Sequence, residues 1–567
     1  MKILKNLKIT FTKKNKQKSG ISRDDFDEKI DNRNNFEKMP APNIEESITA
    51  KEIIEKLPAY CKECRRPVDI RNKQVDLLLS VFDEFNIRYY IQFLEDGRHI
   101  IYLNLEESVN IIQAIKSIKL NEIKCLVNVP DKGKTVIAFR EIEEIFGDIK
   151  SISIITPVWD SIRMNIEIEL IENSKNVYLT KNRNAIITDW TGIIDDNDNE
   201  IVSAVRGFIS DNNKKMCNRD HVDVRSKRFS FFHKDDMKKN KSVSTALLSS
   251  GFQNTIDIVY TWVDGSDSKW RDKKKEYAAS SGVKLPRSDN DARYINNDEL
   301  KYSLRSVWMY APWVRNIFIV TEGHLPPWLD KSNEKIIHIH HEDIFPKRSF
   351  LPVFNSHAIE ANLHRISGLS EYFVYFNDDV FIGREVLPDD FYTFKGLPRI
   401  RFSKSHYIPF RKLNKKDIPT DWAGYNAMKT IFSETGMIFN KKLEHVPHVL
   451  RRSILFEMEK RYPDIFRKTS KSKFRSPQDY AIPSMFANFY ALAYGKAVEH
   501  KNVKNEYAYL DIGKKNSIKK YQSIISKKPM FFCLNATYYE ELSEDEQGKV
   551  INEFLEKMYP FKSPFEL

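Results

Sequence analysis

Two adjacent carboxylates follow an apolar run in the stretch Tyr372-Phe373-Val374-Tyr375-Phe376-Asn377-Asp378-Asp379-Val380-Phe381. The apolar part predicts a buried strand. Ligands of α/β sheets bind at the carboxyl ends of strands, so Asp378 and Asp379 would reach a metal ion there. Neighbouring carboxylates repel each other unless a cation or a strong donor lies between them. The stretch therefore predicts a divalent-cation site with a phosphate-bearing substrate, and an Asn-Asp turn that caps a helix is the alternative.

Strand and helix patterns alternate on both sides of this stretch. The expected strands are 256–263, 316–321, 336–340 and 372–376, and the expected helices are 268–280, 298–310 and 357–366. Such alternation predicts an α/β fold, Rossmann-like or GT-A-like, with a mostly parallel sheet flanked by helices. Longer helices are expected at 445–461 and 477–494, with two more within 516–560.

The sequence pattern divides the chain into five parts. They are a basic, disordered leader (1–48), an α+β accessory domain (50–215), a charged linker (216–250), a catalytic domain (251–510) and a helical C-terminal extension of that domain (511–567). The leader is polar and has little periodicity, as is typical of disordered segments. The accessory domain gives no catalytic signal, so its role stays open.

The 567 residues carry a formal net charge of +12. A basic chain favours polyanionic partners such as nucleotide-sugars, a phosphodiester polymer or an anionic membrane. Neither an RNA-binding aromatic signature nor helix-turn-helix spacing stands out, so nucleic acid is not an expected partner. The Lys-rich start interleaves Ile, Leu and Phe, which leaves two interpretations open: a solubilising tail, or a peripheral contact with the inner face of an anionic membrane.

The five cysteines indicate a reducing compartment rather than a disulfide framework. Cys61 and Cys64 have the spacing of a metal knuckle but lack a second pair, so a zinc site and two ordinary thiols both stay open. The start of the chain lacks the continuous apolar core of a secretory signal. The longest apolar tract, 481–494, is too short to span a bilayer. We therefore expect a cytoplasmic protein.

Further motifs flank the opening stretch in a fixed order. They are Ile256-Asp257-Ile258-Val259-Tyr260-Thr261-Trp262-Val263-Asp264-Gly265, Asn297-Asp298-Glu299-Leu300-Lys301-Tyr302-Ser303-Leu304-Arg305, His445-Val446-Pro447-His448, Phe474-Arg475-Ser476-Pro477-Gln478-Asp479 and the C-terminal Phe532-Cys533-Leu534-Asn535. Together they resemble the conserved blocks of the Stealth family of hexose-1-phosphate transferases. That family includes bacterial capsular polysaccharide phosphotransferases and the catalytic subunit of the animal N-acetylglucosamine-1-phosphotransferase. The short interval between Asp390 and His445 holds no Cys, which favours the bacterial capsule role over the animal one.

The resemblance implies a reaction and a set of site residues. A hexose-1-phosphate, such as N-acetylhexosamine-1-phosphate, would pass from a UDP-sugar to a hydroxyl of a growing capsular oligo- or polysaccharide, with release of UMP. Mg²⁺ or Mn²⁺ would be held by Asp378 and Asp379, His445 would act as the base, and Arg475 would stabilise charge on the transferring phosphate. Asp379 counts among the catalytic residues as well. Substrate contacts are expected from Asp257, Asp264, Asn297, Asp298, Arg305, Asn377, His448 and Asp479, and the capsule export machinery is an expected partner.

Structural roles compete with some of these functional ones. Asp257 could bond a neighbouring loop, Asp264 could belong to a tight turn, and Arg305 could simply pair with Glu299. Acids at the start of a helix also interact favourably with its dipole, which alone would explain residues 297–299. Two other functions stay open. One is a metal-dependent glycosyltransferase that releases UDP, although its usual Asp-x-Asp signature is replaced here by Asn-Asp-Asp. The other is a non-catalytic capsule-assembly protein at the membrane.

Overall fold

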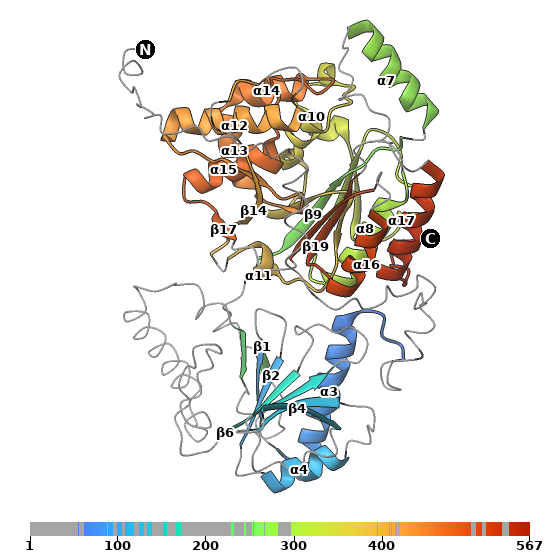
Figure 1. The fold of residues 1–567 in the computed structure, drawn as a ribbon, viewed down its shortest axis with the longest axis vertical. Helices are drawn as coiled ribbons and strands as arrows, with labels where there is room; N and C mark the ends of the chain where they lie inside the picture. The colour runs from blue at the N-terminus through green and yellow to red at the C-terminus, as the bar shows by residue number, and fades with distance from the viewer. Residues whose placement is uncertain are drawn as a thin grey trace, which may run out of the picture. The chain divides into compact units, whose positions relative to one another are not determined.

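The computed structural model describes residues 55 and 62–87, short strands and helices between 89 and 244, and, with brief gaps, residues 252–281, 296–500, 506–512, 517–535 and 544–567. Figure 1 shows the described elements. None of the helices within these ranges is long and apolar enough to cross a membrane. The expected leader 1–48 and Cys61 lie outside the described residues, so those predictions stay predictions.

The central sheet has five strands and is mostly parallel. In sheet order they are β11 (Ile336–His340), β10 (Ile317–Thr321), β9 (Ile256–Thr261), β12 (Tyr372–Asn377) and β16 (His448–Arg451). The first four run parallel, and β16 adds an antiparallel edge beside β12. The predicted α/β class with a mostly parallel sheet is confirmed.

The strand order creates a switch point between β9 and β12. From β9 the chain builds β10 and β11 outward to one edge, and it then returns to place β12 on the opposite side of β9. In sheets of this class, ligands bind in the crevice that such a reversal opens at the carboxyl ends of the strands. Asp264 follows β9, and Asp378 and Asp379 follow β12, at this end of the sheet.

Alternating side chains divide the core into two layers, one on each face of the sheet. Ile258 and Tyr260 of β9 face the layer that contains α8, α16 and α17, whereas Val259 faces the layer that contains α10, α12, α13 and α15 (Figure 1). The helices of this part are α7 (Ser268–Ser281), α8 (Glu299–Tyr310), α10 (Ser356–Glu360), α12 (Pro419–Thr435), α13 (Arg452–Arg461), α14 (Pro463–Lys471), α15 (Ala487–Ala493), α16 (Ser517–Lys527) and α17 (Glu544–Met558).

Two small sheets extend the core beyond the central one. One orders β13 (Val380–Ile382), β19 (Phe531–Asn535) and β18 (Tyr507–Asp511), and the other orders β15 (Lys441–Leu443), β14 (Arg399–His406) and β17 (Val498–His500). β13 follows the two carboxylates directly, and it pairs with β19 from the C-terminal region. This pairing brings residues 533–535 to the end of β12. The two helices expected within 516–560 are present, but the strand between them was not foreseen.

The expected helix 445–461 is wrong in its first part. Residues 448–451 form β16, with His448 opposite Tyr375 and Leu450 opposite Phe373, and only α13 is helical. Backbone pairing with β12 and burial of Val449 and Leu450 outweigh the helical pattern here. The expected helix 477–494 is likewise shorter, because it consists of a π-helical turn at Ile482–Phe486 followed by α15.

The N-terminal strands form a separate sheet, in the order β4-β3-β5-β6-β2-β1-β7-β8, accompanied by α3 (Pro67–Glu84) and α4 (Ser108–Ser117). β7 (Arg228–Phe231) pairs with β1 (Tyr89–Phe93), and β8 (Val243–Ser244) pairs with β7. Both strands lie within 216–250, which we expected to be a charged linker. The alternating Arg-Phe-Ser-Phe pattern of β7 is typical of a strand, and β7 lies between β1 and the edge strand β8. The expected division of the chain into domains stays a prediction.

Candidate active site

Asp379 lies in the turn between β12 and β13, and β19 fixes its carboxylate. Its Oδ2 accepts hydrogen bonds from Asn535 Nδ2 at 2.9 Å and from Cys533 Sγ at 3.5 Å. The backbone N–H of Leu534 donates to the carbonyl oxygen of Asp379 at 3.0 Å. The other carboxylate oxygen, Oδ1, is buried and has no hydrogen-bond partner. Asp379 is therefore held rigidly while one of its oxygens stays available for a ligand.

His445 faces this available oxygen. Its Nε2 lies 3.5 Å from Asp379 Oδ1 and 3.3 Å from Asn377 Nδ2. Burial alone would lower the pKa of His445, but the attraction of Asp379, helped by Glu360, outweighs it and leaves the pKa raised. Burial would likewise raise the pKa of Asp379, but the pairing with His445 outweighs it and leaves that pKa lowered. The two residues form an ion pair with the His 35% exposed, so the ring can reach a substrate.

Three carboxylates crowd the end of β12. Burial, together with repulsion from Asp379 and Glu299, raises the pKa of Asp378 to about 8. Burial also raises the pKa of Glu299, with a contribution from Asp379. Both oxygens of Glu299 accept from Asn297, one from its backbone N–H at 2.6 Å and one from Nδ2 at 2.9 Å. Such a cluster would be stabilised by a cation, because a cation relieves the mutual repulsion.

Glu299 was missed as a site residue by sequence reasoning. We interpreted its position in the first helical turn through the helix dipole, and burial beside Asp378 could not be read from the sequence. Asn297, an expected substrate contact, instead holds Glu299. Asp298 takes a left-handed backbone conformation before α8 and pairs with Lys301 at 2.6 Å. Asp264, after β9, lies 3.5 Å from His324.

Arg475 reaches the site from the loop after α14. Its Nη2 donates to Ser356 Oγ at 2.9 Å, whereas Nη1 is buried and has no hydrogen-bond partner. Its positive charge is close enough to His445 to lower the pKa of that ring, against the larger effect of Asp379. A guanidinium with unused N–H groups is suited to bind a phosphate.

Asp479 does not orient the Arg475 guanidinium directly. Its Oδ2 instead accepts from the backbone N–H of Ser476 and from Asn355 Nδ2, both at 2.8 Å. Asn355 also donates to the carbonyl oxygens of Ser472 and Phe474, which flank the loop. This buried acid therefore shapes the turn that presents Arg475, and its expected substrate contact stays a prediction.

Glu360 is a second acid that the sequence did not single out. It ends α10 and is 5% exposed. Its Oε1 accepts from the Tyr375 hydroxyl at 3.3 Å, and its Oε2 is buried without a hydrogen-bond partner. A buried carboxylate oxygen needs a donor to offset its lost hydration. A substrate hydroxyl close to His445 could supply that donor.

Two predicted substrate contacts lie outside the site. Asp257 sits at the start of β9, at the opposite end of the strand from the carboxylates, where it pairs with Arg315 and accepts from the backbone N–H of Ser370. Arg305 points from α8 to the C-terminus, where it forms two hydrogen bonds with Glu566, at 2.9 and 2.8 Å. These contacts give both residues a structural role, and their expected substrate contacts stay predictions. The suggested pairing of Arg305 with Glu299 is not formed either.

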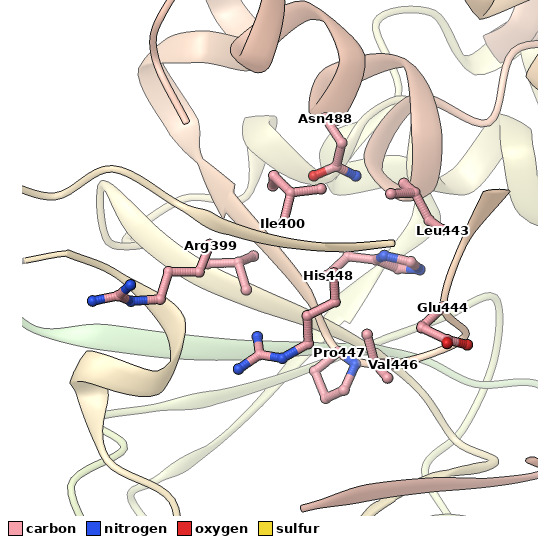
Figure 2. Close-up of a pocket in the computed structure, with 10 residues that line it drawn as sticks. Arg399, Ile400, Leu443, Glu444, Val446, Pro447, His448 and Asn488 are labelled. Carbon is pink, nitrogen blue, oxygen red and sulfur yellow. The ribbon is translucent and has the colours of Figure 1, made fainter. Parts of the chain in front are cut away.

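His448 begins β16 and lies opposite Tyr375 of β12. Its ring stacks on Tyr375, and burial lowers its pKa to about 3, so it stays neutral. Figure 2 shows the cavity that it lines, together with Arg399, Glu444 and Asn488. His445, Asp378 and Asp379 are not among the residues around this cavity. The expected substrate contact of His448 stays a prediction.

Conserved-region models of Stealth proteins match the chain in four places. Conserved region 1 matches residues 254–282, region 2 residues 293–400, region 3 residues 444–492 and region 4 residues 522–567. Region 2 contains Glu299 and Asp379, region 3 contains His445 and Arg475, and region 4 contains Cys533, so these three regions meet at the site described above.

Curated relatives match the same half of the chain. An exopolysaccharide phosphotransferase of Streptomyces coelicolor is 42% identical over 312 residues, which is 55% of this chain and 52% of the relative. The exopolysaccharide phosphotransferase CpsY of Mycobacterium tuberculosis is 36% identical over 319 residues, 55% of this chain and 58% of the relative. The chain thus spans about half the length of the curated relatives it matches.

Solved structures of glycosyltransferases give a weaker likeness. The galactosyltransferase LgtC is 10% identical and covers 54% of this chain and 96% of its own, with a TM-score of 0.28. Mouse xyloside xylosyltransferase 1 is 8% identical and covers 50% of this chain and 98% of its own, with a TM-score of 0.26. Scores this low support no conclusion about function. The four matched regions, which span residues 254–567, place the chain in the Stealth family.

Proposed function

We propose that the chain transfers a hexose-1-phosphate from a UDP-sugar to a hydroxyl of a growing exopolysaccharide and releases UMP. The observation that carries the proposal is the Asp379–His445 pair at the carboxyl end of β12, with Arg475 close enough to act on the same ring. The relatives named exopolysaccharide phosphotransferases match the segment that contains this pair. An N-acetylhexosamine-1-phosphate is the form of the donor that we favour.

The residues at the strand end fit the Mg²⁺ or Mn²⁺ that such a reaction needs. Asp379 Oδ1 and Asn377 Oδ1 are buried oxygens without hydrogen-bond partners, and the pKa of Asp378 is raised by its neighbours as well as by burial. Oxygen donors of this kind suit a hard divalent cation. Asp378 and Asp379 would hold the ion, which when bound would neutralise charge on the pyrophosphate.

The protein's own groups then account for the remaining chemistry. With Nε2 of His445 directed at Asp379, Nδ1 is the atom that would take the proton from the acceptor hydroxyl, and Asp379 would stabilise the resulting imidazolium. The hydroxyl oxygen forms a bond to the β-phosphorus while the bond to the UMP oxygen breaks. Arg475 Nη1 would donate to the transferring phosphate. Glu360 Oε2 would accept from a neighbouring sugar hydroxyl and orient it.

A nucleotide assay tests the proposal. Purified protein would be incubated with Mg²⁺, a panel of UDP-sugars and capsule-type oligosaccharides, and UMP would be separated from UDP. Acceptor-dependent UMP is the expected product. UDP instead of UMP would establish a glycosyltransferase and refute the proposed transfer, and neither nucleotide with any donor would favour a non-catalytic role.

A further inference from the structure

We propose that Asp379, His445 and Cys533 form a transition-metal site, and that Zn²⁺ bound there inhibits the transferase. Among the described residues they are the group of His, Cys, Asp or Glu whose ligand atoms lie within 4.8 Å of one another. The binding half of this inference stands on geometry alone, whereas the inhibitory half rests on the proposed function.

The spacing of the donor atoms suits one small ion. His445 Nε2 lies 3.5 Å from Asp379 Oδ1, and Cys533 Sγ lies 3.5 Å from Asp379 Oδ2. Zinc binds carboxylate oxygen and imidazole nitrogen at about 2.0–2.2 Å and sulfur at about 2.3 Å, so an oxygen ligand at a tetrahedral angle lies about 3.4–3.6 Å from a nitrogen or sulfur ligand of the same ion. Small side-chain rotations would bring all three donors onto one ion.

Neighbouring parts of the fold hold the three donors in place. Asp379 belongs to the β12–β13 turn, His445 precedes β16, and Cys533 lies in the middle of β19, where its backbone pairs with Val380. Asn535 donates to Asp379 Oδ2 and so fixes the carboxylate from behind. Support of ligands by such outer hydrogen bonds is a common feature of metal sites.

The chemistry of the donors separates this site from the one proposed for Mg²⁺. Magnesium prefers oxygen ligands in octahedral geometry. Asn377, Asp378 and Asp379 supply such oxygen atoms at the end of β12. Sulfur and imidazole donors instead select zinc and similar ions. Because Asp379 belongs to both sets, an ion at Cys533 and His445 would compete with magnesium for this carboxylate.

Zinc at this position would also remove the base. A bond from Nε2 to the ion leaves the neutral imidazole protonated at Nδ1, so that atom can no longer accept the proton of the acceptor hydroxyl. Formation of the zinc–sulfur bond releases the thiol proton to solvent, and no electron is transferred. Inhibition therefore needs no large conformational change.

Cobalt provides a spectroscopic probe of the site that does not depend on turnover. Co²⁺ would be titrated into the metal-free full-length protein, and the near-ultraviolet thiolate-to-cobalt absorption would be recorded. In the wild type, the absorption should appear with Co²⁺ and decline when Zn²⁺ is added. In Cys533→Ser the absorption should be absent, and zinc should bind at least tenfold more weakly than to the wild type. A variant with both Cys61→Ser and Cys64→Ser is the matched control and should retain the band.

Each other outcome overturns part of the proposal. The site is refuted if the wild type shows no thiolate-to-cobalt band. It is also refuted if the band survives Cys533→Ser and is lost in the variant with Cys61→Ser and Cys64→Ser. If Cys533→Ser does not fold, His445→Ala tests the same point, because it should weaken zinc binding by a similar factor without changing the core of β19. Zinc that binds as expected but leaves Mg²⁺-supported UMP release unchanged refutes inhibition. Failure to produce UMP at all would refute the proposed function and leave the cobalt result intact.

Discussion

Arg305→Met tests whether this arginine anchors the C-terminus or contacts a phosphate. Arg305 forms two hydrogen bonds with Glu566, at 2.9 and 2.8 Å, and a third with the carbonyl oxygen of Tyr559 at 2.9 Å. The side chains of the ion pair are only 5% and 4% exposed. Loss of one partner from a buried pair costs about 3–5 kcal/mol, because the other charge stays buried. For a domain of this size that corresponds to a melting temperature lower by roughly 6–20 °C.

Two controls separate this buried pair from an ordinary surface pair. The double variant Arg305→Met with Glu566→Gln should recover part of the lost stability, because no unpaired charge remains buried. Lys441→Met removes the pair with Glu499, whose side chains are 44% and 52% exposed, and should cost less than about 1 kcal/mol. Thermal unfolding followed by circular dichroism gives the three melting temperatures.

Turnover decides between the two roles of Arg305. Measured well below its melting temperature, Arg305→Met should release UMP at a rate near that of the wild type. If Arg305 instead bound a transferring phosphate, the variant would melt normally and lose about 10²-fold or more in kcat. That combination would refute the structural assignment.

Three further predictions concern the site itself. Asp379 holds the pKa of His445 up against the effect of burial, so His445 becomes an active base only above this raised pKa. Asp379→Asn should therefore move the acid limb of the kcat–pH profile to lower pH. An unmoved limb would contradict the pairing. Arg475→Lys should lower kcat about 10²-fold while the protein stays folded, whereas Lys468→Ala, on the exposed face of α14, should leave kcat unchanged. EDTA should abolish UMP release and Mg²⁺ should restore it, with Asp378→Asn needing at least tenfold more Mg²⁺; full activity in EDTA would exclude the cation.

The sequence was sufficient for the four parallel strands of the central sheet and for the acids that follow β12, but not for the antiparallel edge strand β16. Apolar runs between helical patterns predicted β9, β10, β11 and β12 within two residues at each end. They could be recognised because parallel strands buried on both faces need continuous apolar sequence. The acids after β12 followed from the same argument, since a buried strand that ends in carboxylates exposes them at the sheet edge. His445 and Arg475 came from the family resemblance, and the structure places His445 beside Asp379 and Arg475 close enough to His445 to affect its pKa.

Other parts of the site depend on contacts that no local pattern encodes. Cys533 and Asn535 reach Asp379 through the pairing of β13 with β19, more than 150 residues later in the chain, and that strand was not foreseen. Glu299 and Glu360 matter because they are buried, whereas acids near a helix end usually face water. The pairing of Arg305 with Glu566 could not be predicted either, because 261 residues of sequence separate the two side chains.

The destination of the β-phosphorus tests the central claim most directly. A UDP-sugar labelled at its β-phosphorus would be incubated with wild-type protein, Mg²⁺ and an acceptor oligosaccharide, with His445→Ala as the control. Phosphoryl transfer predicts that the label enters the oligosaccharide as a phosphodiester, in wild type and not in the variant, with unlabelled UMP as the second product. Label that stays in UDP while the acceptor gains an unlabelled sugar would contradict the account.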